Sequence, residues 1–188
     1  MELLIAGVLL WCAVHFVPTL AKNFKASLVT RMGATPYKGL FAGLIFTALA
    51  LIIIGWNRVE PLNLYDPPVW GVQVNNALMV LSIFLFVAAQ RQTIVRRVLR
   101  HPMLTGLAVW GIAHLFVNGD QRSLIVFGGL TVWAVLEIRL INARDGAWSK
   151  PDAPGAKTEI IGLLITAVAL GVIAFLHNLA GVSPFPHS

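Results

Sequence analysis

The chain alternates between long apolar runs and short polar stretches, and this alternation predicts its architecture. Six apolar runs stand out, over residues 2–21, 39–56, 70–90, 103–118, 123–141 and 159–180. Each is close to the ~20 residues that an α-helix needs to cross a bilayer. Continuous Leu, Ile, Val and Ala lack the strict alternation typical of a membrane β-barrel. The pattern therefore predicts an all-α, polytopic membrane protein with about six transmembrane helices.

Glycine and proline mark the breaks between these runs. Gly33 and Pro36 close the first connection, which we expect to be a loop, and Pro102 fits the first turn of the fourth helix, where its missing N–H is not needed. Because the connections are short, neighbouring helices should run antiparallel in an up-down bundle. We expect one transmembrane domain over 1–182 and a short tail over 183–188.

Composition supports this architecture. Hydrophobic residues make up 57% of the chain and charged residues 12%, whereas soluble domains carry about 25% charged residues. The single cysteine, Cys12, lies inside the first apolar run, which excludes an internal disulfide and a cysteine-based metal site. Glu2 stands at the very start of that run, and Lys22 and Lys25 follow it. This is the reverse of a secretory signal, so we interpret the run as a retained helix.

The distribution of positive charge predicts the orientation. Of the 14 Lys and Arg residues, only Arg58 and Arg122 lie outside the first, third and fifth connections and their flanks. The positive-inside rule places these three connections in the cytoplasm and both termini outside. Although the net charge is +6, the basic residues sit in short connections, where they meet lipid headgroups. We therefore expect a lipid bilayer, and no nucleic acid, as the partner of this charge.

Histidines inside apolar runs are the best candidates for chemistry, because a polar residue there is costly unless it has a partner. With a helical rise of ~1.5 Å per residue, His15 lies about 10–15 Å and His114 roughly 17 Å from the predicted cytoplasmic side. His177 falls near the outer surface, His101 at the cytoplasmic boundary and His187 in the tail. Only His15 and His114 share a level near the middle of the membrane.

Two neutral imidazoles at one level can hold a haem iron from both sides. Trp110, close to His114, and the small Gly106 suit a flat apolar cofactor. Pro18 is expected to bend the first helix beside His15. Residue type and spacing alone leave two alternatives open, namely hydrogen bonding to a neighbouring helix and proton relay.

Other polar residues in the runs predict structural roles. Asn75 and Asn76 are suited to hydrogen bonds between helices, and Glu137 to an ion pair with a nearby arginine at the membrane boundary. We find no nucleophile–base pair, phosphate-binding loop or paired carboxylates. The sequence therefore does not decide whether the protein is an enzyme.

One stretch of the chain resembles a known family. It consists of Arg100-His101-Pro102-Met103-Leu104-Thr105-Gly106, then Trp110-Gly111-Ile112-Ala113-His114-Leu115, then Asn118-Gly119-Asp120. This stretch, with the earlier His15-Phe16-Val17-Pro18, resembles the NnrU family, and the resemblance covers nearly the whole chain. It implies a multi-pass protein of the bacterial inner membrane that acts in denitrification, in the expression or function of nitrite and nitric oxide reductases.

The NnrU family is in turn similar to the plant 15-cis-zeta-carotene isomerase, a membrane enzyme that uses haem b held by two histidines. That resemblance implies His114 and His15 as iron ligands, the same pair that the depth estimate selects. The expected cofactor is haem b, and the expected cofactor-binding residues are His15, His114, Trp110 and Asn118. Partners implied by the family are denitrification proteins or nitric oxide.

Two enzymatic alternatives remain. One is a haem-dependent isomerase, as in the plant enzyme. The other is an S-adenosylmethionine-dependent methyltransferase, because isoprenylcysteine-type membrane methyltransferases use a similar Arg-His-Pro run. Here Leu104 replaces the tyrosine of that run and the expected paired acidic residues are missing. A cofactor-free membrane scaffold is the third reading.

Overall fold

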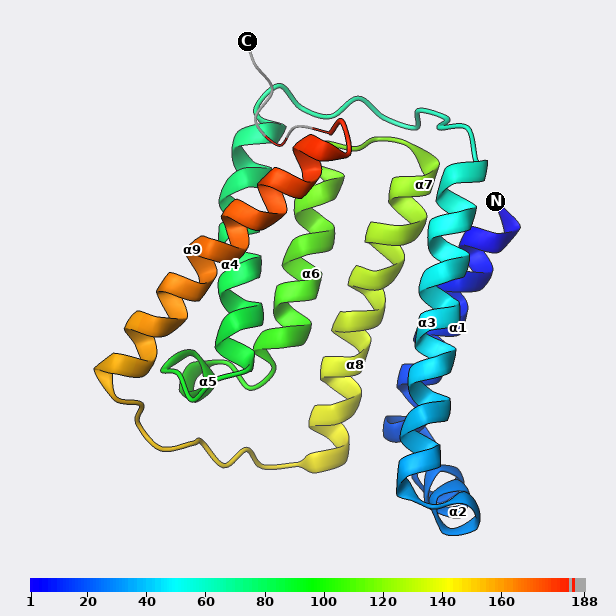
Figure 1. Cartoon of the computed structure of the whole chain (residues 1–188), viewed down its shortest axis with the longest axis vertical. Coiled ribbons are helices and arrows are strands. Elements are labelled where there is room, and N and C mark those ends of the chain that lie inside the picture. Colours follow the sequence, from blue (N-terminus) through cyan, green and yellow to red (C-terminus); the bar gives the residue numbers. More distant parts are fainter. Residues whose placement is uncertain (183, 185–188) are drawn as a thin grey trace. The chain divides into compact units, whose positions relative to one another are not determined.

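The computed structural model describes residues 1–182 and 184, and its regular structure is helical (Figure 1). In chain order the helices are α1 (Glu2–Leu20), α2 (Lys22–Met32), α3 (Ala34–Arg58), α4 (Gly71–Ala89), α5 (Val95–Val98), α6 (Pro102–Leu115), α7 (Gln121–Ser123), the π-helical segment η1 (Leu124–Gly128), α8 (Gly129–Asp145) and α9 (Ala156–Leu179). No strand occurs among the described residues. The predicted all-α class is confirmed, and the predicted tail, 183–188, lies outside the described residues except for Pro184.

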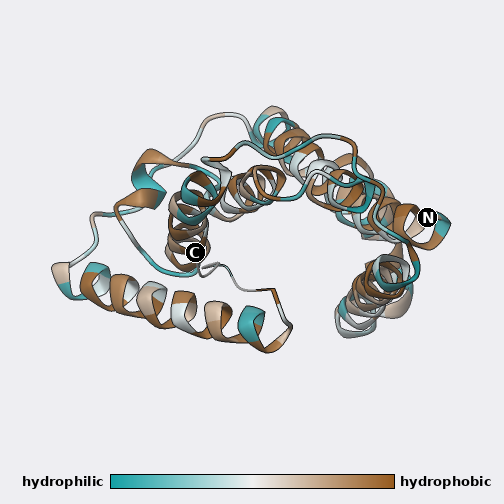
Figure 2. Cartoon of the chain, turned by 90° about the horizontal axis from the view of Figure 1, so that it is seen from above, coloured by the Kyte–Doolittle hydropathy of each residue, from teal (hydrophilic) through white to brown (hydrophobic). Residues whose placement is uncertain are grey.

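Each of the six predicted runs forms a helix. Five helices among the described residues are long and apolar enough to cross a membrane, namely α1, α3, α4, α9 and the continuous helix Gln121–Asp145 that α7, η1 and α8 form together. The sixth, α6, is also apolar, but its 14 residues make it shorter than these five helices. Hydrophobic residues are spread all round the long helices in Figure 2, which is typical of helices within a membrane. The protein is therefore a multi-pass membrane protein.

The first connection differs from our prediction, because most of it is helical. Where we expected a loop, the chain forms α2, a basic helix with no buried residue. Gly33 adopts φ 91° and separates α2 from α3, a backbone conformation that favours glycine. Pro36 lies in the first turn of α3, so this helix begins at Ala34 rather than at residue 39.

Contacts divide the chain into two compact units, which we describe one at a time. Unit 1 comprises Met1–Asp66 and Asn118–Gly146, and unit 2 comprises Pro67–Val117 and Ala147–Ser188. Unit 1 thus contains α1, α2, α3 and the helix Gln121–Asp145, and unit 2 contains α4, α5, α6 and α9.

In unit 1, α1 packs against both α3 and α8. The closest approach is at Gly55 of α3, where an added Cβ would lie 2.5 Å from the backbone nitrogen of Leu4. An added Cβ at Gly7 would lie 2.9 Å from the carbonyl oxygen of Ala48. Small residues at such points let membrane helices approach closely. The order of these pairs shows that α1 and α3 are antiparallel, as predicted.

In unit 2, α4 packs against α6 and α9. Ser82 Oγ donates to the carbonyl oxygen of Gly106 at 2.8 Å, and an added Cβ at Gly71 would lie 2.1 Å from the carbonyl oxygen of Phe116. These pairs make α4 and α6 antiparallel. Gly106 is a contact point with α4, and its predicted role in leaving room for a cofactor stays a prediction.

Two loops of unit 1 form what we call the loop clasp, residues 62–65 against 118–122. The backbone nitrogens of Leu64 and Tyr65 both donate to the carbonyl oxygen of Gly119, at 2.8 and 3.2 Å. The Tyr65 hydroxyl donates to the carbonyl oxygen of Asn118 at 2.9 Å. An isolated β-bridge joins Asn63 to Asp120. The clasp therefore ties the end of α3 to the start of α7.

Asp120 caps the helix that leaves the clasp. Its Oδ1 accepts hydrogen bonds from the backbone nitrogens of Arg122 and Ser123, and its Oδ2 accepts one from the Ser123 hydroxyl. Burial alone would raise the pKa of this carboxyl, but the hydrogen bonds from Ser123 and Arg122 hold the pKa below its ordinary value. The Arg122 guanidinium also stacks over the Trp56 ring, 4.7 Å from its centroid.

Candidate functional site

The His15 ring lies in an aromatic cluster of unit 1. Its ring centroid is 4.5 Å from that of Trp11, 4.9 Å from that of Trp133 and 5.5 Å from that of Phe41. These rings come from α1, α8 and α3, so all three long helices of the unit contribute. Pro18 lies inside α1, which ends two residues later at Leu20. The aromatic cluster therefore lies near the C-terminal end of α1.

A buried carboxyl lies one helical turn beyond the Trp133 contact. Glu137 is 5% exposed, and its Oε1 accepts a hydrogen bond from the Thr19 hydroxyl. Its Oε2 is buried without a hydrogen-bond partner among the described residues. The two ion pairs found in the described chain are Asp120–Arg122 and Arg144–Asp145. Our expectation of an ion pair at Glu137 was wrong, because α8 turns this side chain toward α1.

His114 lies in unit 2, on α6, next to Trp110. Their ring centroids are 5.0 Å apart, and the structure thus brings together two of the four predicted cofactor-binding residues. His15 and Asn118 belong to unit 1. The pairing of His15 with His114 remains a prediction.

Both histidines have the same local arrangement. Each follows a tryptophan by four residues, in Trp11-x-x-x-His15 and Trp110-x-x-x-His114, and each ring contacts that tryptophan. Our sequence analysis placed Trp110 close to His114 but did not note that the same spacing recurs in the first helix. A search for repeated short motifs within the apolar runs would have found it.

A backbone contact sets the tautomer that each ring has when it is neutral. Nδ1 of His15 lies 2.9 Å from the carbonyl oxygen of Trp11, and Nδ1 of His114 lies 2.9 Å from that of Trp110. Since a carbonyl oxygen only accepts, Nδ1 must carry the hydrogen, and a neutral ring then has its lone pair on Nε2. A partner of this kind on the second nitrogen is typical of metal-ligating histidines. In the neutral form of each ring, the lone pair therefore lies on Nε2.

His177 shows that the backbone contact alone does not identify a ligand. Its Nδ1 lies 2.8 Å from the carbonyl oxygen of Ile173, the same geometry without a tryptophan. His177 is in the last turn of α9, consistent with its predicted place near a membrane surface. It provides a matched control for His15 and His114.

Two other residues considered in the sequence, His101 and Asn118, lie just outside the two ends of α6. Asn118 lies outside α6, which ends at Leu115, and its carbonyl oxygen accepts from Tyr65 in the loop clasp. His101 precedes Pro102 at the start of α6, as predicted. His187 lies outside the described residues. Of these three residues, only Asn118 was predicted to bind the cofactor. The structure shows its carbonyl oxygen in the loop clasp, and its role toward a cofactor stays a prediction.

The surroundings of His15 fit an apolar cofactor with a polar edge. The indole nitrogens of Trp11 and Trp133 are buried, and neither has an acceptor among the described residues. A buried N–H without an acceptor is unfavourable, so a ligand that carries an acceptor there would stabilise both. The aromatic rings around His15 would meanwhile exclude water from its Nε2.

The fold and the two Trp-x-x-x-His arrangements define an α-helical, multi-pass membrane protein with a histidine in each of two apolar helices. The model of one family, described as NnrU protein, matches residues 3–184. The chain belongs to the NnrU family. No curated protein and no solved structure matches it.

Proposed function

We propose that this protein binds haem b, with Nε2 of His15 and Nε2 of His114 as the axial ligands. The observation that carries the proposal is the shared Trp-x-x-x-His arrangement, in which the Nδ1 contact leaves Nε2 of each ring as the lone-pair atom. The similar depths of the two residues, estimated from the sequence, agree with it. When bound, haem supplies a one-electron redox centre whose potential depends on its ligands and on the polarity around them.

The side chains around the histidines have defined roles in this proposal. Trp11 and Trp110 stack on the ligand rings and, with the backbone contacts, hold their orientation. Trp133 and Phe41 pack against His15 and lower the polarity around it. Low polarity around a haem ligand is one of the means by which a protein sets the redox potential.

We further propose that the protein acts in the bacterial inner membrane, in nitrogen-oxide metabolism. Support for this role comes from membership of the NnrU family. Likeness to that family implies an association with nitrite and nitric oxide reductases. A haem protein suits such a role as a redox partner, a nitric oxide-responsive protein or a maturation factor.

Optical spectroscopy tests haem binding directly. The detergent-purified protein is measured oxidised and then dithionite-reduced, with a pyridine haemochrome assay for the haem content. We expect a Soret band, sharp reduced α and β bands and about one haem per chain. Nitric oxide added to the reduced protein should shift the bands if the haem takes part in nitric oxide chemistry.

Three substitutions test the ligands. His15→Ala and His114→Ala should each lose haem or convert its spectrum to that of a haem with one histidine. His177→Ala should keep the full spectrum, although it removes an imidazole with the same backbone contact. Wild-type spectra for both the His15 and His114 variants would refute the assignment. If no haem is bound at all, S-adenosylmethionine binding that depends on His101 would identify the methyltransferase alternative.

A further inference from the structure

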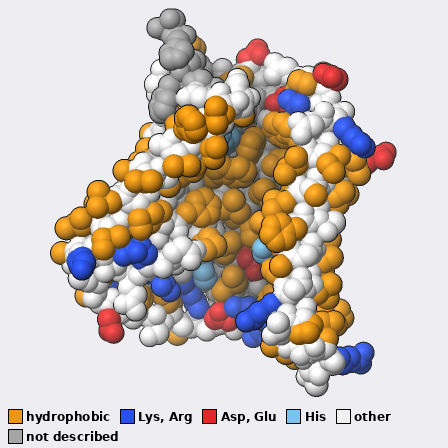
Figure 3. Space-filling view, viewed as in Figure 1, with side chains coloured by type: hydrophobic (Ala, Val, Ile, Leu, Met, Phe, Trp, Pro, Cys, Tyr) orange, Lys and Arg blue, Asp and Glu red, His pale blue; other side chains and the backbone are white. Residues whose placement is uncertain are grey.

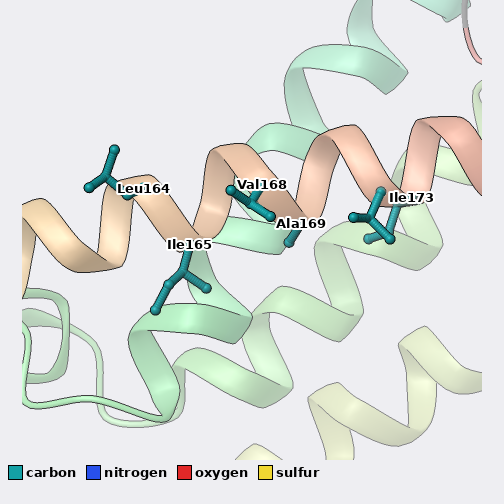
Figure 4. A pocket seen from close by; sticks show the side chains of 6 residues that line it. Leu164, Ile165, Val168, Ala169 and Ile173 are labelled. Atoms are coloured by element: carbon teal, nitrogen blue, oxygen red, sulfur yellow. The ribbon is translucent and has the colours of Figure 1, made fainter.

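Unit 2 contains an apolar groove between α4 and α9. Its cavity volume is about 460 Å³, within the range of pockets that hold small ligands. It is lined by Ile83, Phe86, Val87, Gln90 and Arg91 on the α4 side and by Ile165, Ala169 and Ile173 of α9. A second cavity of about 430 Å³ continues along α9 past the same three residues. Figure 4 shows Ile165, Ala169 and Ile173 following one another along this helix.

The groove is apolar along its length and basic at one end. Arg91 follows the last turn of α4, and its Nε is buried without a hydrogen-bond partner among the described residues. Arg97 of the short helix α5, which contacts α4, also has a buried Nε without a described partner. In Figure 3, Lys and Arg side chains gather beside the lower ends of α4 and α9, next to hydrophobic side chains. Charge and apolar surface therefore meet at one end of the groove.

No carboxylate of the described chain pairs with these two arginines. The acidic residue at this end of α9 is Glu159, and its Oε1 accepts from the backbone nitrogen of Ile94 at 2.7 Å. Both ion pairs found among the described residues lie in unit 1. A buried guanidinium N–H without an acceptor is unfavourable, so Arg91 is prepared for an anion from outside the chain.

We propose that the α4–α9 groove binds one anionic glycerophospholipid. Its phosphate accepts hydrogen bonds from Arg91, with Arg97 as a second cation, and an acyl chain lies along Ile165, Ala169 and Ile173. A guanidinium matches the geometry of a phosphate oxygen pair. Basic pockets between transmembrane helices on the cytoplasmic side are typical sites for anionic headgroups, and the sequence places this end of α4 on that side. The proposal is independent of haem binding.

Native mass spectrometry of the full chain in detergent can test this site. Phosphatidylglycerol and phosphatidylcholine with identical acyl chains are titrated separately, and phosphatidylglycerol should bind more tightly. Arg91→Ala should weaken phosphatidylglycerol binding by about tenfold or more, since hydrogen bonds between charged groups are stronger than neutral ones. Arg96→Ala is the matched control, because Arg96 is an exposed cation on α5 that does not line the groove. Its effect should stay within about twofold, since exposed charges contribute little.

A second variant tests the apolar part of the groove. Ala169→Phe keeps every arginine but fills the space along α9, and it should also weaken phosphatidylglycerol binding by about tenfold, since the acyl chain then loses its apolar contacts. Equal losses in the Arg91 and Arg96 variants, or equal binding of the two lipids, would overturn the proposal. So would unchanged binding in Ala169→Phe, or competition by inorganic phosphate at lipid-like concentrations, because either result would reduce the site to a surface anion site. Loss of haem in Arg91→Ala would assign the arginine to that cofactor instead.

Discussion

Gly119 makes the sharpest structural prediction, because the loop clasp leaves no space for a side chain there. An added Cβ would lie 1.8 Å from the carbonyl oxygen of Tyr65 and 3.0 Å from its carbonyl carbon. Both atoms belong to the backbone, so no side-chain rotation can relieve the clash. Gly119→Ala must therefore move residues 62–65 away from residues 118–122.

The expected cost follows from the bonds that this movement breaks. Leu64 and Tyr65 donate two backbone hydrogen bonds to Gly119, and the Tyr65 hydroxyl donates a third to Asn118. At about 0.5–1.5 kcal/mol for each net hydrogen bond, loss of these three bonds in Gly119→Ala should lower the free energy of unfolding by about 1.5–4.5 kcal/mol. The measurement is reversible unfolding in mixed detergent micelles, followed by tryptophan fluorescence.

Gly43→Ala is the matched control. Gly43 lies inside α3, and an added Cβ there meets no atom within 4 Å. Because alanine is the better helix former by about 1 kcal/mol, this variant should be neutral or slightly more stable than the wild type. If Gly119→Ala unfolds at the same denaturant concentration as Gly43→Ala, the clasp does not contribute to stability as described.

Three further predictions concern the same unit. Gly55→Ala should cost about 1–3 kcal/mol, because its Cβ would force α3 away from the Leu4 backbone; stability equal to that of the wild type would contradict this packing. Thr19→Val should cost about 1 kcal/mol, typical of a hydrogen bond between membrane helices, whereas Glu137→Gln keeps an acceptor for Thr19 and should cost less. Asp120→Asn should be destabilising above pH ~4, the ordinary pKa of Asp. Because folding lowers the pKa of Asp120, its stabilising charge is fully present above that pH and is lost as the pH falls through the folded value. The difference in the free energy of unfolding between Asp120→Asn and the wild type should therefore decrease as the pH falls. A difference that is the same at every pH would contradict this role.

Much of the fold could be predicted from hydrophobicity and helix-breaking residues. The six apolar runs became helices because continuous apolar sequence has one stable form in lipid, and Pro102 marked the start of α6 correctly. Helix α2 was missed because its residues are polar and bury nothing. Hydrophobic periodicity carries no signal for such a helix.

Less of the candidate site could be predicted. The choice of His15 and His114 needed only depth and residue type, but the partners of His15 on other helices, Trp133 and Phe41, needed the packing of α1 against α8 and α3. Glu137 was misread for the same reason. Its nearest arginine along the chain suggested an ion pair, whereas its hydrogen-bond partner, Thr19, lies on another helix. Sequence neighbours predict contacts within a helix and not between helices.

The shortness of α6 has a consequence for the surrounding lipid. Its 14 residues span ~21 Å at 1.5 Å per residue, whereas the hydrocarbon core of a bilayer is about 30 Å thick. This hydrophobic mismatch is relieved when the bilayer thins beside the helix, at fractions of a kcal/mol per Å. We therefore expect the protein to be more stable in bilayers of short-chain lipids than of long-chain lipids. The thickness of the membrane would then help to determine where the protein accumulates.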